Sequence, residues 1–215
     1  MRSITLRRLN AIQNTLGPTS RISKPAQASL IFSQPITSMA QEPTILPDAD
    51  KGPVFFWREF EEPYGFLSQW YECVFEHDGL KYCHSEMWMM TQKAKLFGDE
   101  ESFKKMMQTT VAKEHQALGR KVKGYNGKIW DENKSRIVEE GNWWKFTNCL
   151  DQPHIKRLLL ETGDRELVEA SPVDRIWGVG FDAQSAEANR EAWGQNLLGR
   201  AIFAVRKRIR EQEST

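Results

Sequence analysis

The chain has 215 residues, of which 40% are hydrophobic and 27% are charged, with 30 lysines and arginines against 29 aspartates and glutamates. This length suits a single domain with a sizeable core, to which a tail can be attached. The near balance of charge argues against a protein built to coat nucleic acid, and no apolar run approaches the ~20 residues of a membrane helix. We therefore expect a soluble globular protein that does not enter a membrane.

The first 41 residues differ in composition from the rest. They contain no acidic residue, and their five charged side chains are basic: Arg2, Arg7, Arg8, Arg21 and Lys24. The other 25 basic and 29 acidic residues leave a net charge of about −4. Because apolar residues also recur at helical spacing between residues 6 and 16, we interpret this leader as a mitochondrial transit peptide, with a disordered tail as the alternative. The predicted location is intracellular, mitochondrial with a transit peptide and cytoplasmic without one.

The three cysteines, Cys73, Cys83 and Cys149, form no CxxC pair and are odd in number. This pattern argues against a disulfide framework and fits a reducing compartment. The four histidines lack the spacing of metal ligands, so we expect no metal and no cofactor.

The predicted elements follow a Pro- and Asp-rich linker at 42–53. Aromatic and β-branched residues predict a strand over 54–60 and a hairpin over 70–83 that turns at 77–79. Apolar spacing then predicts helices, at 85–97, 100–108, 111–119, 130–140, 153–161 and 187–210, with a short strand in the sequence ELVEASP. The prediction is a mainly α domain over 54–212, with a small β element near its N-terminal end.

Two charged residues share one face of the helix expected at 85–97. Seven residues at ~100° each bring Glu86 and Lys93 to within about 20° of one direction, separated by ~10 Å along the axis. Met89, Met90 and Phe97 lie on the same face, which we therefore expect to be buried. The pair could grip a ligand, or each charge could meet its own partner or reach solvent.

Two glycine-containing segments are further candidates. In DRIWGVG (174–180), Asp174 is a catalytic carboxylate or the residue that closes an Asx turn, and Trp177 and Gly178 imply a tight backbone path. In GQNLLGR (194–200), the pattern does not support a dinucleotide-binding unit. Its Asn, second Gly and Arg could still hold a phosphate, or the glycine could simply pack inside a helix. Trp130 and the segment 143–146 add aromatic faces beside Lys145.

Eight segments, taken in order, resemble the NADAR (YbiA-like) family from about Phe55 to Arg210. They are GFLSQWY (65–71), SEMWMMTQKAKLFGD (85–99), LGRKV (118–122), the Trp130 segment, KFTNCLD (145–151), LLLETGDRELVEAS (158–171), DRIWGVG (174–180) and GQNLLGRAIFAVR (194–206). The resemblance implies a compact, mainly helical fold. It also implies cleavage of N-glycosidic bonds in ribosylated pyrimidine intermediates of riboflavin synthesis or in ADP-ribosylated guanine, as free nucleotide or within nucleic acid.

The family's polar pocket positions fall on Glu86, Lys93, Lys145, Asp174, Trp177, Gly178, Asn196 and Gly199. The chain departs from the family at Gln69, where Asn is usual, and at Met87, where Gln is usual, which bears on substrate choice.

The resemblance implies a role for each candidate. Glu86 and Asp174 would stabilise an oxocarbenium-like transition state or activate water. Lys93 would protonate the leaving base or form a Schiff base with ring-opened ribose. Trp130 or Trp177 would stack on the base, and Arg200 with the 194–199 turn would receive phosphate. The alternative is a module that binds ADP-ribose or NAD without cleaving it.

Overall fold

The computed structural model describes residues 52–215, so the leader at 1–41 and nearly all of the linker at 42–53 lie outside the described residues. The targeting role of the leader therefore stays a prediction. Within 52–215, no helix combines the length and the hydrophobicity that a bilayer crossing requires.

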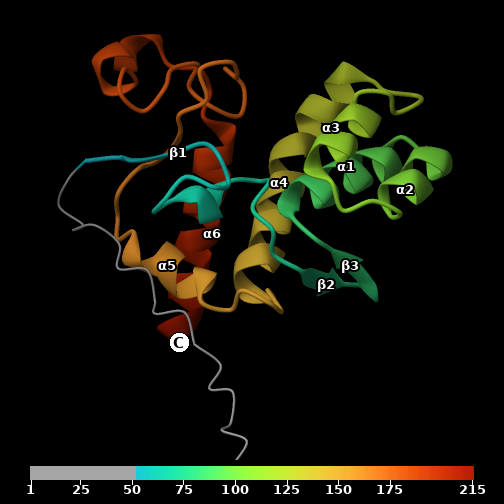
Figure 1. Cartoon of the computed structure of the whole chain (residues 1–215), viewed down its shortest axis with the longest axis horizontal. Helices are drawn as coiled ribbons and strands as arrows, with labels where there is room; N and C mark the ends of the chain where they lie inside the picture. The colour runs from blue at the N-terminus through green and yellow to red at the C-terminus, as the bar shows by residue number, and fades with distance from the viewer. Residues whose placement is uncertain (1–51) are drawn as a thin grey trace, which may run out of the picture. The chain divides into compact units, whose positions relative to one another are not determined.

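Four consecutive helices make up the first helical group: α1 (Ser85–Leu96), α2 (Glu100–Met106), α3 (Ala112–Gly119) and α4 (Gly127–Thr147). The other three pack around α1 (Figure 1). Capping side chains start three of them: His84 for α1, Asp99 for α2 and Asn126 for α4. The first three helices agree with the predicted spans to within two residues, and α4 extends beyond its predicted span, 130–140, at both ends.

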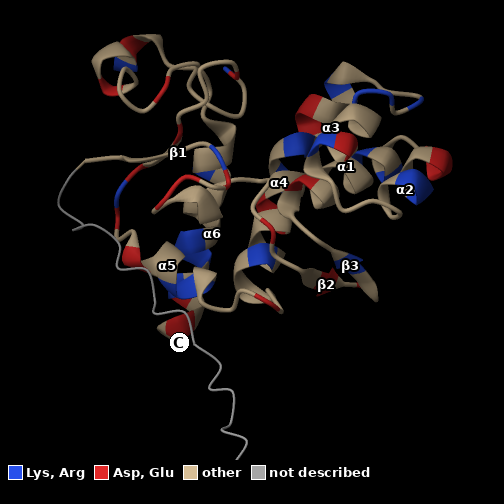
Figure 2. Ribbon diagram, in the orientation of Figure 1, with Lys and Arg blue, Asp and Glu red and all other residues tan. Residues whose placement is uncertain are grey.

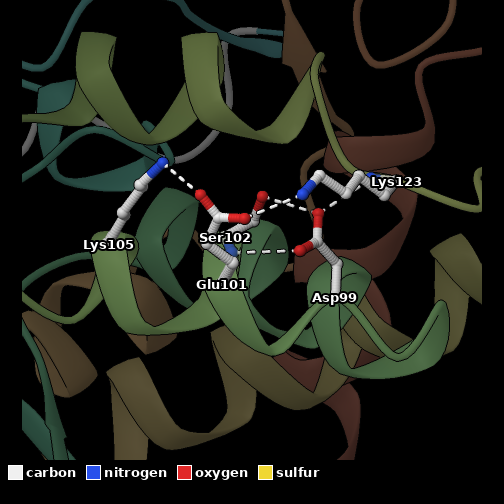
Figure 3. Close-up of polar contacts among 5 residues, drawn as sticks. All are labelled: Asp99, Glu101, Ser102, Lys105 and Lys123. Carbon is white, nitrogen blue, oxygen red and sulfur yellow. Dashed lines mark hydrogen bonds and ion pairs between the residues drawn. The ribbon is translucent and has the colours of Figure 1, made fainter.

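Asp99 fixes the corner between α1 and α2. Its carboxylate accepts hydrogen bonds from the backbone N–H and the hydroxyl of Ser102, at 3.1 and 2.6 Å, and from the backbone N–H of Lys123 at 2.8 Å (Figure 3). These bonds, that of the Ser102 hydroxyl first, lower the pKa of Asp99 to about 2. Glu101 forms ion pairs with Lys105 and with Lys123, each at 2.7 Å. These contacts tie the start of α2 to the segment that contains Lys123.

The β structure consists of two small sheets. Strands β2 (Phe75–His77) and β3 (Leu80–Tyr82) form the predicted antiparallel hairpin, and Asp78 and Gly79 both adopt positive φ, 51° and 73°, at its turn. Strand β1 (Val54–Phe56) pairs in parallel with the distant β4 (Leu167–Glu169), Val54 opposite Leu167. Strand β1 is shorter than its predicted span, 54–60, and β4 confirms the short strand expected in ELVEASP.

The C-terminal part joins this parallel sheet to α4. Helix α5 (Ile155–Glu161) precedes β4, and α6 (Leu197–Glu213) packs against both α4 and β4. Basic residues recur along α6 (Figure 2). One of them, Arg206, is buried and donates to the Thr162 hydroxyl at 2.5 Å and to the Arg165 carbonyl at 2.7 Å. Helix α6 therefore fixes the turn that leads into β4. The mainly α class with a small β element is confirmed.

The prediction of one long helix over 187–210 is wrong for residues 187–196. Residues Glu187–Ala192 form a 3₁₀ segment, η2, and α6 begins only at Leu197. The backbone N–H groups of residues 194–198 donate to carbonyls of residues 175–179 instead of to a helix. Asn196 sits in the left-handed region at φ 48°. A Cβ at Gly194 would lie 2.3 Å from the Arg175 carbonyl oxygen, so close packing between the two loops requires this break.

Candidate active site

A cleft of about 530 Å³ is lined by α1, the end of β4 and the loops around them. Its ionisable residues are Arg58, Glu59, Glu86, Lys93, Arg120, Glu169 and Asp174. Its tryptophans are Trp57, Trp70, Trp130 and Trp177. The cleft thus gathers carboxyl groups, cations and flat aromatic faces in one space.

Glu86 lies in the first turn of α1 and is only 4% exposed. Its backbone N–H donates to the Gln69 carbonyl at 3.0 Å, which holds the neighbouring wall of the cleft against the helix start. Burial raises the pKa of Glu86 to about 7, although a hydrogen bond from the Trp70 side chain and the charges of Arg120 and Lys93 act in the opposite direction. Near neutral pH this carboxyl group can therefore accept or donate a proton.

Glu169 is a second carboxyl group of the cleft, one that sequence reasoning did not select. Burial raises its pKa to about 8, and the negative charges of Asp174 and Glu86 add to this effect. Its Oε2 atom is buried and has no hydrogen-bond partner among the described residues. The sequence did contain a signal for Glu169, namely a single glutamate within the apolar strand sequence LVEA. A carboxyl group is costly to bury, so its presence in a buried strand indicates a functional role.

Asn196 and Gly199, which the resemblance places in the pocket, contact β4 and do not line the cleft. The Asn196 side chain accepts a hydrogen bond from the Glu169 backbone N–H at 3.0 Å and donates one to the Leu167 carbonyl at 2.9 Å. A Cβ at Gly199 would lie 2.0 Å from the same Leu167 carbonyl oxygen. Both residues therefore position the strand that carries Glu169.

Asp174 closes an Asx turn and also lines the cleft, so the turn does not exclude the catalytic role that the sequence left open. Its Oδ1 accepts hydrogen bonds from the backbone N–H groups of Ile176 and Trp177, both at 2.8 Å, and so closes an Asx turn. The residue also lines the cleft, as Trp177 does. The turn thereby holds a carboxylate and an indole in the same wall.

Lys93 lies two helical turns after Glu86 on the same face of α1 and lines the same cleft, as the helical spacing predicts. Its Nζ atom sits 4.5 Å from the centroid of the Tyr125 ring and 5.2 Å from that of Trp130. Desolvation lowers the pKa of Lys93, and the nearby Glu86 partly opposes this shift. A larger fraction of neutral amine makes the group a better nucleophile and proton carrier.

Lys145, Gly178 and Arg200 do not line the cleft. Lys145 is fully buried, and its Nζ donates to the Ser68 carbonyl at 2.7 Å, so it supports the wall from behind. Burial lowers its pKa to about 8. Gly178 lies against the strand, where a Cβ would be 2.7 Å from the Glu169 carbonyl oxygen. Arg200 is exposed on α6.

The cations that line the cleft are Arg58 and Arg120, in addition to Lys93. The Arg58 guanidinium lies 3.9 Å from the centroid of the Trp57 ring. Arg120 follows α3 directly. It belongs to the segment LGRKV, one of the eight that resemble the family, but it was not among the predicted site residues. These two arginines are the positions where an anionic group of a ligand would find a positive charge.

The two departures from the family pattern have different surroundings. Gln69 lines the cleft, and its Nε2 atom is buried with no hydrogen-bond partner among residues 52–215. Met87 belongs to the hydrophobic core and does not line the cleft. A change in substrate preference would therefore act through Gln69.

In the described part of the chain, one group of side chains brings three potential metal-ligand atoms within 4.8 Å of one another, namely Cys73, Cys149 and Asp151. None of the three lines the cleft.

The chain is similar to known proteins both in sequence and in fold. The NADAR domain profile matches residues 55–210. The chain is 41% identical over 148 residues to N-glycosidase R617 of Acanthamoeba polyphaga mimivirus, covering 66% of this chain and 85% of that protein. It is 29% identical to the riboflavin biosynthesis protein VVA0006 of Vibrio vulnificus, over 74% of this chain and 39% of that longer protein. Its fold is similar to the NMR structure of the E. coli protein YbiA, with a TM-score of 0.63, 22% identity and coverage of 81% and 93%.

Proposed function

The chain belongs to the NADAR domain family, and on this premise we propose that it is an N-glycosidase that hydrolyses the bond between a ribosyl carbon and a base nitrogen. The observation that carries the proposal is the convergence of Glu86, Glu169, Asp174 and Lys93 on one cleft, where burial moves two carboxyl pKa values to about 7 and about 8. The similarity to a protein named N-glycosidase supports the same reaction type.

We further propose that the substrate is a ribosylated nucleotide, either ADP-ribosyl-guanine or a ribosylamino-pyrimidine of riboflavin synthesis. The indoles of Trp130 and Trp177 offer stacking faces for a base. Arg58 and Arg120 offer positive charge for phosphate. The similarity to a riboflavin biosynthesis protein supports the pyrimidine branch, although this chain spans well under half of that relative.

Each ionisable group then has a task that its environment suits. Cleavage develops positive charge at the anomeric carbon, and an ionised Glu86 or Asp174 stabilises that charge or activates water. Glu169, protonated at neutral pH because its pKa is about 8, donates the proton that the leaving base needs. Lys93 has a lowered pKa and acts either as a second proton donor or as a nucleophile that forms a Schiff base with ring-opened ribose.

The deciding experiment incubates the full chain with ADP-ribosylated guanine DNA and, separately, with ribosylated pyrimidine intermediates, and measures released base and sugar by mass spectrometry. Release from either substrate is the expected result. Lys93→Met should abolish it, whereas Lys95→Met, on the exposed side of the same helix, should not. Binding of these ligands without release would favour the module that only holds ADP-ribose or NAD. Borohydride trapping of a Lys93 adduct separates Schiff-base chemistry from acid catalysis.

A further inference from the structure

Two cysteines that are far apart in the sequence meet at the edge of the fold. Cys73 precedes β2 and Cys149 follows α4, and their sulfur atoms lie 2.7 Å apart. The backbones on both sides are tied together, because the Leu150 N–H donates to the Val74 carbonyl at 2.7 Å and the Val74 N–H to Asp151 at 2.8 Å. The contact between the two thiols is therefore set by the framework and not by side-chain rotation alone.

The two thiols have unequal surroundings. Cys73 is fully buried, and it donates hydrogen bonds to the Cys149 sulfur and to the Lys145 carbonyl. Cys149 is partly exposed, donates a hydrogen bond to the Asp151 carboxylate at 3.3 Å and accepts one from the Gln152 N–H at 3.3 Å. The hydrogen bond from Cys73 lowers the pKa of Cys149, and that same bond, together with burial, raises the pKa of Cys73. A partly exposed cysteine with a lowered pKa beside a buried cysteine is the arrangement of an attacking and a resolving cysteine.

A shared metal ion suits this geometry less well. Two thiolates on one tetrahedral zinc, each with a Zn–S bond of ~2.3 Å, are separated by roughly 3.8 Å. The observed 2.7 Å between the sulfurs is far shorter, and full burial of Cys73 leaves that sulfur no approach from solvent. The pair is instead close to the separation at which a sulfur–sulfur bond can form.

We propose that Cys73 and Cys149 form a redox-active dithiol that closes to an intramolecular disulfide on reaction with a low-molecular-weight disulfide such as oxidised glutathione. The Cys149 thiolate attacks one glutathione sulfur, which forms a mixed disulfide and releases one glutathione thiolate. The Cys73 sulfur then attacks the Cys149 sulfur, releases the second glutathione thiolate and gives its proton to it or to water. Two electrons pass from the protein dithiol to glutathione disulfide, which is reduced to two thiols.

The dithiol is connected to the wall of the cleft through Lys145. The Lys145 side chain is fully buried and forms no ion pair with a carboxylate in the described part of the chain, and a negative charge on the cysteine pair would favour its charged form. A closed disulfide cannot carry that charge. Since Lys145 holds the Ser68 carbonyl beside Gln69 and Trp70, oxidation alters the support of that wall.

The test treats the native full chain with glutathione disulfide, quenches with an alkylating agent and measures the intact mass and a non-reducing digest. The expected mass shows the loss of two hydrogen atoms and the gain of at most one alkyl group, on Cys83, and the digest contains one peptide pair that joins Cys73 to Cys149. Three thiols that all remain alkylated, a glutathione adduct that persists on the wild-type protein, or a bond to Cys83 would each overturn the proposal. The wild-type digest decides this question without any variant.

Single substitutions assign the order of the two steps. Cys73→Ala should retain one glutathione on Cys149, since no resolving thiol remains, and Cys149→Ala should leave Cys73 unmodified. Cys83→Ser is the matched control and should form the same disulfide as the wild type. The Cys83 sulfur bonds to Met87 and to the Thr110 carbonyl, and its one hydrogen bond to Cys73 joins backbone atoms, which the substitution keeps. A glutathione adduct on Cys73 in the Cys149→Ala protein would refute the assigned order.

Discussion

Replacing Glu169 by glutamine tests whether a neutral carboxyl group at the end of β4 supplies the proton to the leaving base. A pKa raised from 4.5 to about 8 corresponds to a penalty on the order of 5 kcal/mol on the ionised form, part of which belongs to the coupling with Glu86 and Asp174. Glutamine keeps the shape of the side chain but has no acidic proton. We therefore expect kcat to fall by about 10²- to 10⁴-fold, the usual contribution of a general acid.

The pH dependence gives the sharper measurement. An ionised Glu86 with a pKa of about 7 and a protonated Glu169 with a pKa of about 8 in the free protein predict a bell-shaped pH profile of kcat/KM between these values. Glu169→Gln should remove the alkaline limb and keep the acidic one. Glu166→Gln is the matched control, since Glu166 lies just before the same strand, is exposed and pairs with Arg190. The assay is initial-rate release of base from whichever substrate the panel identifies.

A second readout separates catalysis from folding. Because the folded pKa of Glu169 lies above its unfolded value, the unfolded chain loses this proton first, and the wild type loses stability as pH rises from about 4.5 to about 8. The free energy of unfolding of Glu169→Gln, relative to the wild type, should therefore be larger at pH 9 than at pH 5. An unchanged kcat with an intact alkaline limb would refute the acid role, and an unchanged difference in stability would refute the burial argument.

Three further predictions concern other parts of the site and its scaffold. Lys93→Met should lower base release at least a hundredfold, measured as single-turnover product formation, and wild-type turnover would remove the lysine from the mechanism. Gly199→Ala should lower the midpoint of thermal unfolding, because its Cβ would lie 2.0 Å from the Leu167 carbonyl oxygen, and an unchanged midpoint would show that α6 can shift freely. His84, whose pKa burial lowers to about 4, caps α1 through the Met87 N–H, so stability should decline as pH falls from 6.5 towards 4 by on the order of 3 kcal/mol. His84→Asn, which keeps a capping acceptor, should flatten that decline in urea titrations across this pH range.

Local sequence patterns predicted the helices well where apolar residues recur with the period of an α-helix. Apolar spacing located α1 and α2, because the apolar residues that define each helix lie within a few residues of each other. The same signal failed between 187 and 196. There the backbone N–H groups find better acceptors in the loop at 175–179, a partner that no local window contains. Glu86 and Lys93 were found for the converse reason, since the period of one helix brings them together.

Glu169 shows why the rest of the site could not be predicted in the same way. Its strand pairs with β1, more than a hundred residues earlier in the chain, and its carboxyl group lies in a cleft that Glu86 and Asp174 line from other parts of the sequence. Two motif residues hold β4 from a distant part of the sequence. Asn196 bonds the edge of the strand that does not pair with β1, and Gly199 allows α6 to approach it closely. A motif therefore contains two kinds of residue, those that face the cleft and those that bring a distant carboxyl group into it. The pKa of Glu169 distinguishes these two kinds of residue. Substituting a residue that only positions β4, such as Asn196, should shift this pKa although every side chain that lines the cleft is still present.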